Sequence, residues 1–330
     1  MAYPQVGSVN GGYNDTASTQ HTVNLPSGIA AGDLLLVFFT LYCTGGANYG
    51  VSFPSGWTVQ YDQLYSNYER GVLYKRIADG TEGSTITVSS TGSAKSAHTS
   101  YRIASSGSQG YTLNRVASAV GSGSNTSTPN PPSLSPAWGS DETLWFAVTH
   151  TRGNVTVSSY PTGYSNGRND VGASSDSAGI GTARRELTAS SEDPGTFSLS
   201  ATNRCFAATV GVCAIEKPAV TTQPCSDVTQ NSCKGNGTIT DTGGENCHTR
   251  GFCYMQGTSG DPTIENDKVY DDGGGSYGTG SYSKTISGLQ QNTGYRVRAY
   301  AINSVGVGYG STVQVTTQRA NPLPTHYVIR

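Results

Sequence analysis

The histidines are the first residues to consider for catalysis, because histidine is the side chain that most often transfers protons near neutral pH. The five histidines are scattered along the chain: His21, His98, His150, His248 and His326. No two of them have the His-x-x-x-His spacing of a metal motif, and no Walker phosphate loop is present. The sequence therefore predicts a non-enzymatic protein without a cofactor. Catalysis by groups that only the fold brings together remains an alternative.

A cluster of carboxylates surrounds a glycine-rich turn near the C-terminus and could hold calcium through its oxygens. Its members are Asp261, Glu265, Asp267, Asp271 and Asp272. Their spacing matches no EF-hand loop, so we favour solvated turn residues and predict no metal site.

The seven cysteines also argue against a metal centre. They are Cys43, Cys205, Cys213, Cys225, Cys233, Cys247 and Cys253. The number is odd and no Cys-x-x-Cys pair occurs, which disfavours a designed disulfide framework or a zinc site. We expect buried, reduced thiols, although the cysteines between Cys225 and Cys253 could still oxidise.

A run of tyrosines offers the best candidates for ligand binding. Tyrosine combines a flat apolar ring with a hydroxyl group, which suits both glycans and protein partners. Tyr61, Tyr65 and Tyr68 precede Tyr74 in one short stretch, and we select these first three as candidate binding residues. Ordinary strand and loop packing is the alternative.

The composition limits the classes of partner. Only 13% of the 330 residues are charged and the formal net charge is −2, so no basic surface is available for nucleic acid. The longest apolar run, Leu34–Phe39, is far too short to cross a bilayer and predicts one buried strand instead. We therefore expect neither nucleic-acid binding nor membrane insertion.

The elements that position these residues are strands, and the same order of landmarks occurs twice before residue 217. An acidic residue opens an apolar run at Asp33 and again 108 positions later at Asp141. Pro-x-Gly turns begin at Pro54 and Pro161, and a later pair of matched glycines, Gly83 and Gly195, is 112 positions apart. These landmarks predict one jelly-roll-like β-sandwich over 1–217, with internally repeated halves at about 25–104 and 133–216. Trp57 and Tyr164, which follow the turns, are expected to pack over the strand ends.

The last third changes to a single series of short strands. The stretch Gly288–Gly306 resembles the closing strands of fibronectin type III domains, with Tyr295 at the position of the corner tyrosine. The resemblance implies an Ig-like or fibronectin type III-like module over 218–318. Gln291 replaces the usual proline, and no Arg-Gly-Asp tripeptide occurs, so integrin binding is not implied.

The first region is similar to β-sandwich proteins encoded among bacteriophage structural genes, through the segments Leu25–Asp33 and Asn130–Leu134. Residues 1–5 lack the features of a secretory signal, so we expect synthesis in the host cytoplasm. The composition, however, is typical of extracellular adhesive β-proteins. A virion protein would fit both observations, because it is made in the host cytoplasm and released by lysis.

The predicted function is a structural role on the particle, as a capsid decoration, head fibre or tail-associated protein. Expected partners are other virion proteins, further copies of the chain in a homo-oligomer, and host-surface or environmental glycans. The alternatives are a carbohydrate-binding adhesin and a glycan-degrading enzyme with accessory modules.

An extended arm over 319–330 follows the last module. We predict that Tyr327, Val328 and Ile329 pair with the sheet edge of a neighbouring subunit. An arm that folds back on its own domain is the alternative.

Overall fold

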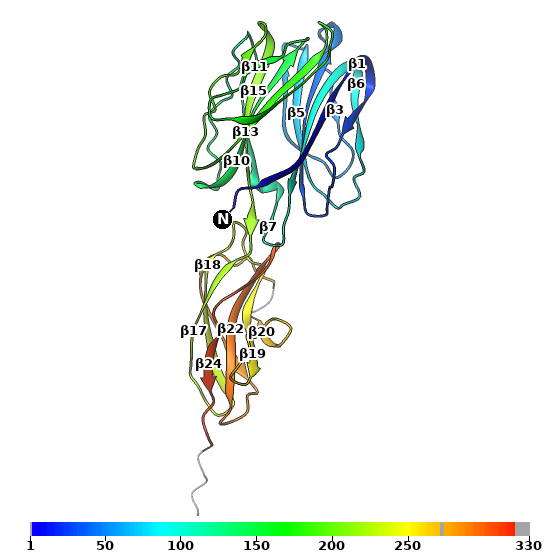
Figure 1. The fold of residues 1–330 in the computed structure, drawn as a ribbon. Coiled ribbons are helices and arrows are strands. Elements are labelled where there is room, and N and C mark those ends of the chain that lie inside the picture. Colours follow the sequence, from blue (N-terminus) through cyan, green and yellow to red (C-terminus); the bar gives the residue numbers. More distant parts are fainter. Residues whose placement is uncertain (1, 271–273, 321–330) are drawn as a thin grey trace, which may run out of the picture. The chain divides into compact units, whose positions relative to one another are not determined.

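The computed structural model describes residues 2–270 and 274–320, and their regular structure consists of β-strands and two short 3-10 turns (Figure 1). The chain divides into two compact units, Met1–Ala214 and Ile215–Arg330, so the boundary lies three residues before the predicted one. The predicted all-β class, a β-sandwich followed by an Ig-like or fibronectin type III-like sandwich, is confirmed. Within the described ranges, no helix is long and apolar enough to cross a membrane.

The first sheet of the first unit is built from residues 5–104 (Figure 1, blue to cyan). Its strands run in the antiparallel order β1-β6-β2-β5-β4, and β3 pairs with β6. Their bounds are β1 (Gln5–Asn24), β2 (Leu34–Cys43), β3 (Val51–Ser52), β4 (Thr58–Tyr65), β5 (Glu69–Ile77) and β6 (Thr85–Ala104).

The second sheet repeats this order with residues 116–213 (Figure 1, green). Read from the matching edge, its order is β8-β15-β10-β13-β12, with β9 beside β15 and the pair β11 and β14 apart. The bounds are β8 (Val116–Val120), β9 (Ser124–Thr126), β10 (Asp141–Arg152), β11 (Val157–Ser159), β12 (Ser165–Val171), β13 (Ala178–Ala189), β14 (Ser198–Leu199) and β15 (Asn203–Cys213). Strand β7 (Gln109–Gly110) and a 3-10 turn (Leu113–Arg115) lie between the two sheets in sequence.

The long strands of each predicted half therefore pair within one sheet. The chain completes the first sheet before it starts the second, whereas in a jelly roll the chain passes back and forth between the sheets. The Pro-x-Gly turns match in conformation as well, because Gly56 and Gly163 have φ angles of 86° and 82°, which favour glycine.

The main core lies between the sheets, where the central strands β2 and β10 face each other. Phe38 of β2 and Phe146 of β10 lie 5.9 Å apart between ring centroids, and Tyr101 packs edge-on against Phe146 at 4.9 Å. A second cluster covers the outer face of β2, where Phe53 stacks on Tyr74 and contacts Trp57. Strand β2 is buried on both faces, which explains its continuous apolar run.

The second unit is a sandwich of a three-stranded and a five-stranded sheet. The orders are β17-β18-β21 and β20-β19-β22-β23, with β24 beside β22. The bounds are β16 (Ile215–Glu216), β17 (Ala219–Ser226), β18 (Ser232–Asp241), β19 (Thr249–Gln256), β20 (Asp267–Tyr270), β21 (Gly280–Ser287), β22 (Gly294–Asn303), β23 (Gly306–Tyr309) and β24 (Val313–Thr316). Tyr295 at the start of β22 accepts a 2.8 Å hydrogen bond from the backbone N–H of Gln290, which is the bond that a corner tyrosine makes.

Asp33 and Asp141, the acidic residues that recur in the two halves, each form an ion pair with an arginine. Asp33 is fully buried directly before β2, and its carboxylate accepts hydrogen bonds from Arg102 Nε at 2.5 Å, from the N–H groups of Ala30 and Ser105, and from the Ser105 hydroxyl. Asp141 at the start of β10 makes an ion pair at 2.6 Å with Arg115, which lies in the 3-10 turn before β8. The Asp141 and Arg115 side chains are each 12% exposed, whereas that of Asp33 is 1% exposed.

Replacing Asp33 by alanine is expected to lower the free energy of unfolding by about 2–4 kcal/mol, because buried donors lose their acceptor. The matched variant Asp141→Ala should cost less, because its ion pair is more exposed. Urea denaturation of both variants, followed by circular dichroism, measures the difference. Equal losses would contradict the assigned roles.

Candidate functional site

The tyrosines that the sequence suggested as binding residues contribute to packing. Tyr61 of β4 is only 7% exposed, and its hydroxyl lies 2.8 Å from Nε2 of His150. Tyr65 and Tyr68 are half-buried, and the ring of Tyr68 has the guanidinium carbon of Arg204 4.3 Å from its centroid. Tyr61 matches the packing alternative, because the pairing of β4 with β5 turns this side chain into the core between the sheets.

His150 of β10 is the centre of a polar network that joins the two sheets. Its Nδ1 lies 2.7 Å from the hydroxyl of Thr40 on β2, and that hydroxyl donates to the carbonyl of Gly179 on β13 at 3.1 Å. Because Thr40 has only one proton to give, it accepts the Nδ1–H of His150. The hydroxyl of Tyr61 then donates to the free Nε2, so every polar atom of a neutral imidazole has a partner.

Burial fixes this imidazole in its neutral form. His150 is fully buried and stacks on Phe206 with 4.6 Å between ring centroids. Burial lowers the pKa of His150 to about 3 from its usual 6.5. The unfolded chain therefore takes up a proton first as the pH falls. Between pH 6.5 and 3 this residue alone reduces the stability of the fold by about 1.4 kcal/mol per pH unit.

Glu69 of β5 is a second buried titratable residue of the same unit. It is 0% exposed, and neither carboxyl oxygen has a hydrogen-bond partner among the described residues. Burial raises the pKa of Glu69 well above its usual 4.5, although Arg152 and Arg204 act in the opposite direction. Burial, with a contribution from Glu69, also raises the pKa of Cys205 to about 12.

These residues are of the types that catalyse proton transfer, but all of them are buried. The hydrogen bonds of His150 are made within the protein, and Cys205 keeps its proton at neutral pH. We therefore assign the network a structural role, in which it sets the position of one sheet on the other.

Asp261, the first of the acidic residues after β19, makes its contacts with residues far from it in the sequence. Asp261 binds Arg296 at 3.0 Å and the Thr312 hydroxyl at 2.7 Å. Asp271 and Asp272 lie outside the described residues, as do Tyr327, Val328 and Ile329 of the predicted arm. In the part of the chain that the structure describes, no group of three or more histidine, cysteine, aspartate or glutamate side chains could hold a metal ion.

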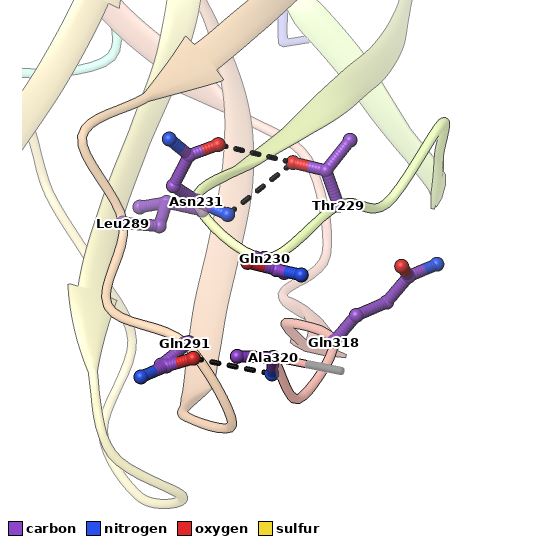
Figure 2. A pocket seen from close by; sticks show the side chains of 7 residues that line it. All are labelled: Thr229, Gln230, Asn231, Leu289, Gln291, Gln318 and Ala320. Atoms are coloured by element: carbon purple, nitrogen blue, oxygen red, sulfur yellow. Dashed lines mark hydrogen bonds between the residues drawn. The ribbon is translucent and has the colours of Figure 1, made fainter. Parts of the chain in front are cut away.

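A pocket of about 650 Å³ opens among three turns of the second unit (Figure 2). The turns are those between β17 and β18, between β21 and β22, and after β24. The lining residues are Thr229, Gln230, Asn231, Leu289, Gln291, Gln318 and Ala320. Backbone bonds between turns fix the walls, from Leu289 N–H to Asn231 O at 2.9 Å and from Gln318 N–H to Thr229 O at 2.8 Å.

The pocket presents uncharged amides that keep hydrogen-bonding capacity. Gln291 uses its Oε1 to accept from the N–H of Ala320 at 3.1 Å, and Asn231 Oδ1 accepts from the Thr229 hydroxyl at 3.3 Å (Figure 2). The amides of Gln230 and Gln318 make no hydrogen bond with any residue that the structure describes. Such a lining suits a neutral ligand rich in hydroxyl groups, because each amide both donates and accepts.

Sequence reasoning missed this pocket. Its turns are far apart in the chain, and each alone resembles a solvated loop. The available signal was the concentration of amides at Gln230, Asn231 and Gln291, in segments that a fibronectin type III fold brings to one end of the sandwich.

The Glu69→Gln variant is expected to be more stable than the wild type above pH 4.5. In the wild type the unfolded chain releases its proton at about pH 4.5 whereas the folded chain retains it, so stability falls by about 1.4 kcal/mol per pH unit up to the raised pKa. Glutamine has nearly the same shape and no proton to lose. Thermal unfolding at pH 4.5 and at pH 8 should show an advantage only at pH 8.

The exposed Glu186→Gln is the matched control and should change the melting temperature little at either pH. If Glu69→Gln were less stable than the wild type at pH 8, the Glu69 carboxylate would be ionised and stabilised by its arginine neighbours.

Comparisons with known proteins find only weak structural similarity. No family model and no curated protein matches it. Among solved structures, it is similar to domains A168–A170 of titin, with 13% identity over 96% of this chain and 99% of that chain and a TM-score of 0.28. It is also similar to the FN1–FN3 domains of chicken CNTN1, with 12% identity over 96% of this chain and 100% of that chain and a TM-score of 0.22. A third similar structure is the sensor domain of the anti-sigma factor RsgI4 from Pseudobacteroides cellulosolvens, with 15% identity over 32% of this chain and 98% of that chain and a TM-score of 0.24. Similarities of this size carry no argument about function.

Proposed function

We propose that this chain is a non-enzymatic structural protein on the surface of a bacteriophage particle, as a capsid decoration, head fibre or tail-associated protein, and that it contacts glycans through the amide-lined pocket of its second unit. The observation that carries the glycan part is that Asn231, Gln230, Gln291 and Gln318 line one pocket with no charged residue among its described lining residues. The low charge of the whole chain supports a role at an exposed, adhesive surface.

A sugar suits this pocket for a physical reason. Each sugar hydroxyl donates one hydrogen bond and accepts others, and a primary amide offers both functions on one rigid plane. Asn231 and Gln291 keep N–H groups pointing away from their internal bonds, while Gln230 and Gln318 supply whole amides. A charged ligand would find no counter-charge among the lining residues.

The same lining indicates weak binding at each site. Leu289 is the only large apolar side chain among the lining residues that the structure describes, so little apolar area is available there for the face of a sugar ring. Weak sites give firm attachment when many copies bind one surface together. A particle that carries many copies of the chain supplies that multivalency, which is why the two parts of the proposal belong together.

The double variant Gln230→Ala, Gln318→Ala is expected to lose at least about fivefold in binding to a neutral glycan, because each amide contributes about 0.5–1.5 kcal/mol. The measurement uses the full chain, made multivalent on beads, on an array of neutral oligosaccharides. Gln256→Ala is the matched control, since Gln256 is an exposed glutamine of the same unit outside the pocket. Equal binding by all three proteins, or no binding by the wild type, would reject the pocket as a glycan site.

The structural part is tested on phage particles. We expect mass spectrometry of gradient-purified particles from a lysed host culture to detect the chain in a fixed ratio to the major capsid protein, and cryo-electron microscopy to show its density on the outer surface. If every particle preparation lacks the chain while the bacterial surface carries it, the adhesin alternative replaces this proposal.

A further inference from the structure

Two of the seven cysteines meet at one end of the second unit. Cys225 lies in the edge strand β17 and Cys233 near the start of the neighbouring strand β18. Both pack in the core cluster of this unit, where Cys233 is fully buried and Cys225 partly exposed.

A β-bulge brings these two side chains to the same face. The pairing of β17 with β18 joins Gln223 to Asn236 but Ser226 to Lys234, so β17 has one extra residue between the two pairs. Val220 faces the core, and strict alternation from it would turn Pro224 inward and Cys225 outward. The extra residue shifts the alternation and turns Cys225 inward.

The two thiols pack in the same core cluster and are close enough to interact through a side-chain hydrogen bond. This interaction raises the pKa of the Cys225 thiol and lowers that of the Cys233 thiol, whose thiolate is the nucleophilic form. The other cysteines of the described residues are buried, and Cys253 donates instead to the carbonyls of Pro262 and Arg298.

We infer that Cys225 and Cys233 form a disulfide when the protein meets an oxidising small-molecule disulfide. One thiolate of the pair attacks the S–S bond of oxidised glutathione, which forms a mixed disulfide and releases one reduced glutathione. The second thiolate then attacks the mixed disulfide and releases the other glutathione. The two cysteines lose two electrons and two protons, and oxidised glutathione gains both as two thiols.

Partial exposure of Cys225 gives the oxidant access to the pair, and the resulting bond closes the loop between the two strands. That loop contains Thr229, Gln230 and Asn231, so the bond also ties the ends of the turn that forms one wall of the pocket. The inference rests on the cysteine pair and is independent of any glycan.

The test uses the full reduced chain, incubated with oxidised glutathione and then alkylated under denaturing conditions. We expect the loss of two of the seven thiols and a single cross-linked peptide that joins Cys225 to Cys233. Cys225→Ser and Cys233→Ser should each form no cross-link, whereas Cys253→Ser, the matched control, should still lose two thiols.

The peptide map of the wild type decides the matter even if a serine variant folds poorly. A full set of seven free thiols, a stable mixed disulfide with glutathione on Cys225, or a cross-link to any other cysteine would each overturn the inference. A raised melting temperature of the oxidised wild type, reversed by dithiothreitol, would support it further.

Discussion

A neutral imidazole between the two sheets of the first unit sets how those sheets fit together. Thr40 and Tyr61 of one sheet satisfy both nitrogens of His150 of the other, so sliding one sheet by a residue would break these buried hydrogen bonds. Leaving a buried polar group unpaired costs about 1–3 kcal/mol, whereas apolar contacts alone tolerate small shifts. Space for the ring depends on Gly71, because a Cβ atom there would lie 2.6 Å from the imidazole and 2.3 Å from Phe206.

Local patterns were enough to predict most of the architecture. The apolar run from Leu34 is a central strand because both of its faces are covered. Asp33 and Asp141 mark equivalent positions because each lies where a central strand begins and forms an ion pair with an arginine. Tyr295 was identifiable because its role depends on a turn five residues away. Each of these signals acts over a few residues or recurs in both halves, so one sequence suffices to read it.

The parts that sequence could not predict depend on long-range pairing. Tyr61 was selected as a candidate binding residue because nothing near it in the sequence indicates His150, which lies 89 positions later in the chain. The amide pocket needs three separate turns to meet, and the inward position of Cys225 depends on a single extra residue in its strand. Register and sheet packing decide such details, and a one-residue shift in pairing reverses which face a side chain occupies.

The division of the first unit into one sheet per half limits what either half can be alone. A single half would expose the whole inner face of its sheet, with Phe38 and Leu36 on one or Phe146 and Val148 on the other, and would have to associate with a second copy to fold. Because the halves are joined in one polypeptide, their association is intramolecular. The effective concentration of one half near the other is in the millimolar range. Each half therefore pairs with the other half of its own chain before it can meet another molecule. Assembly of this sandwich no longer depends on the concentration of the protein in the cell.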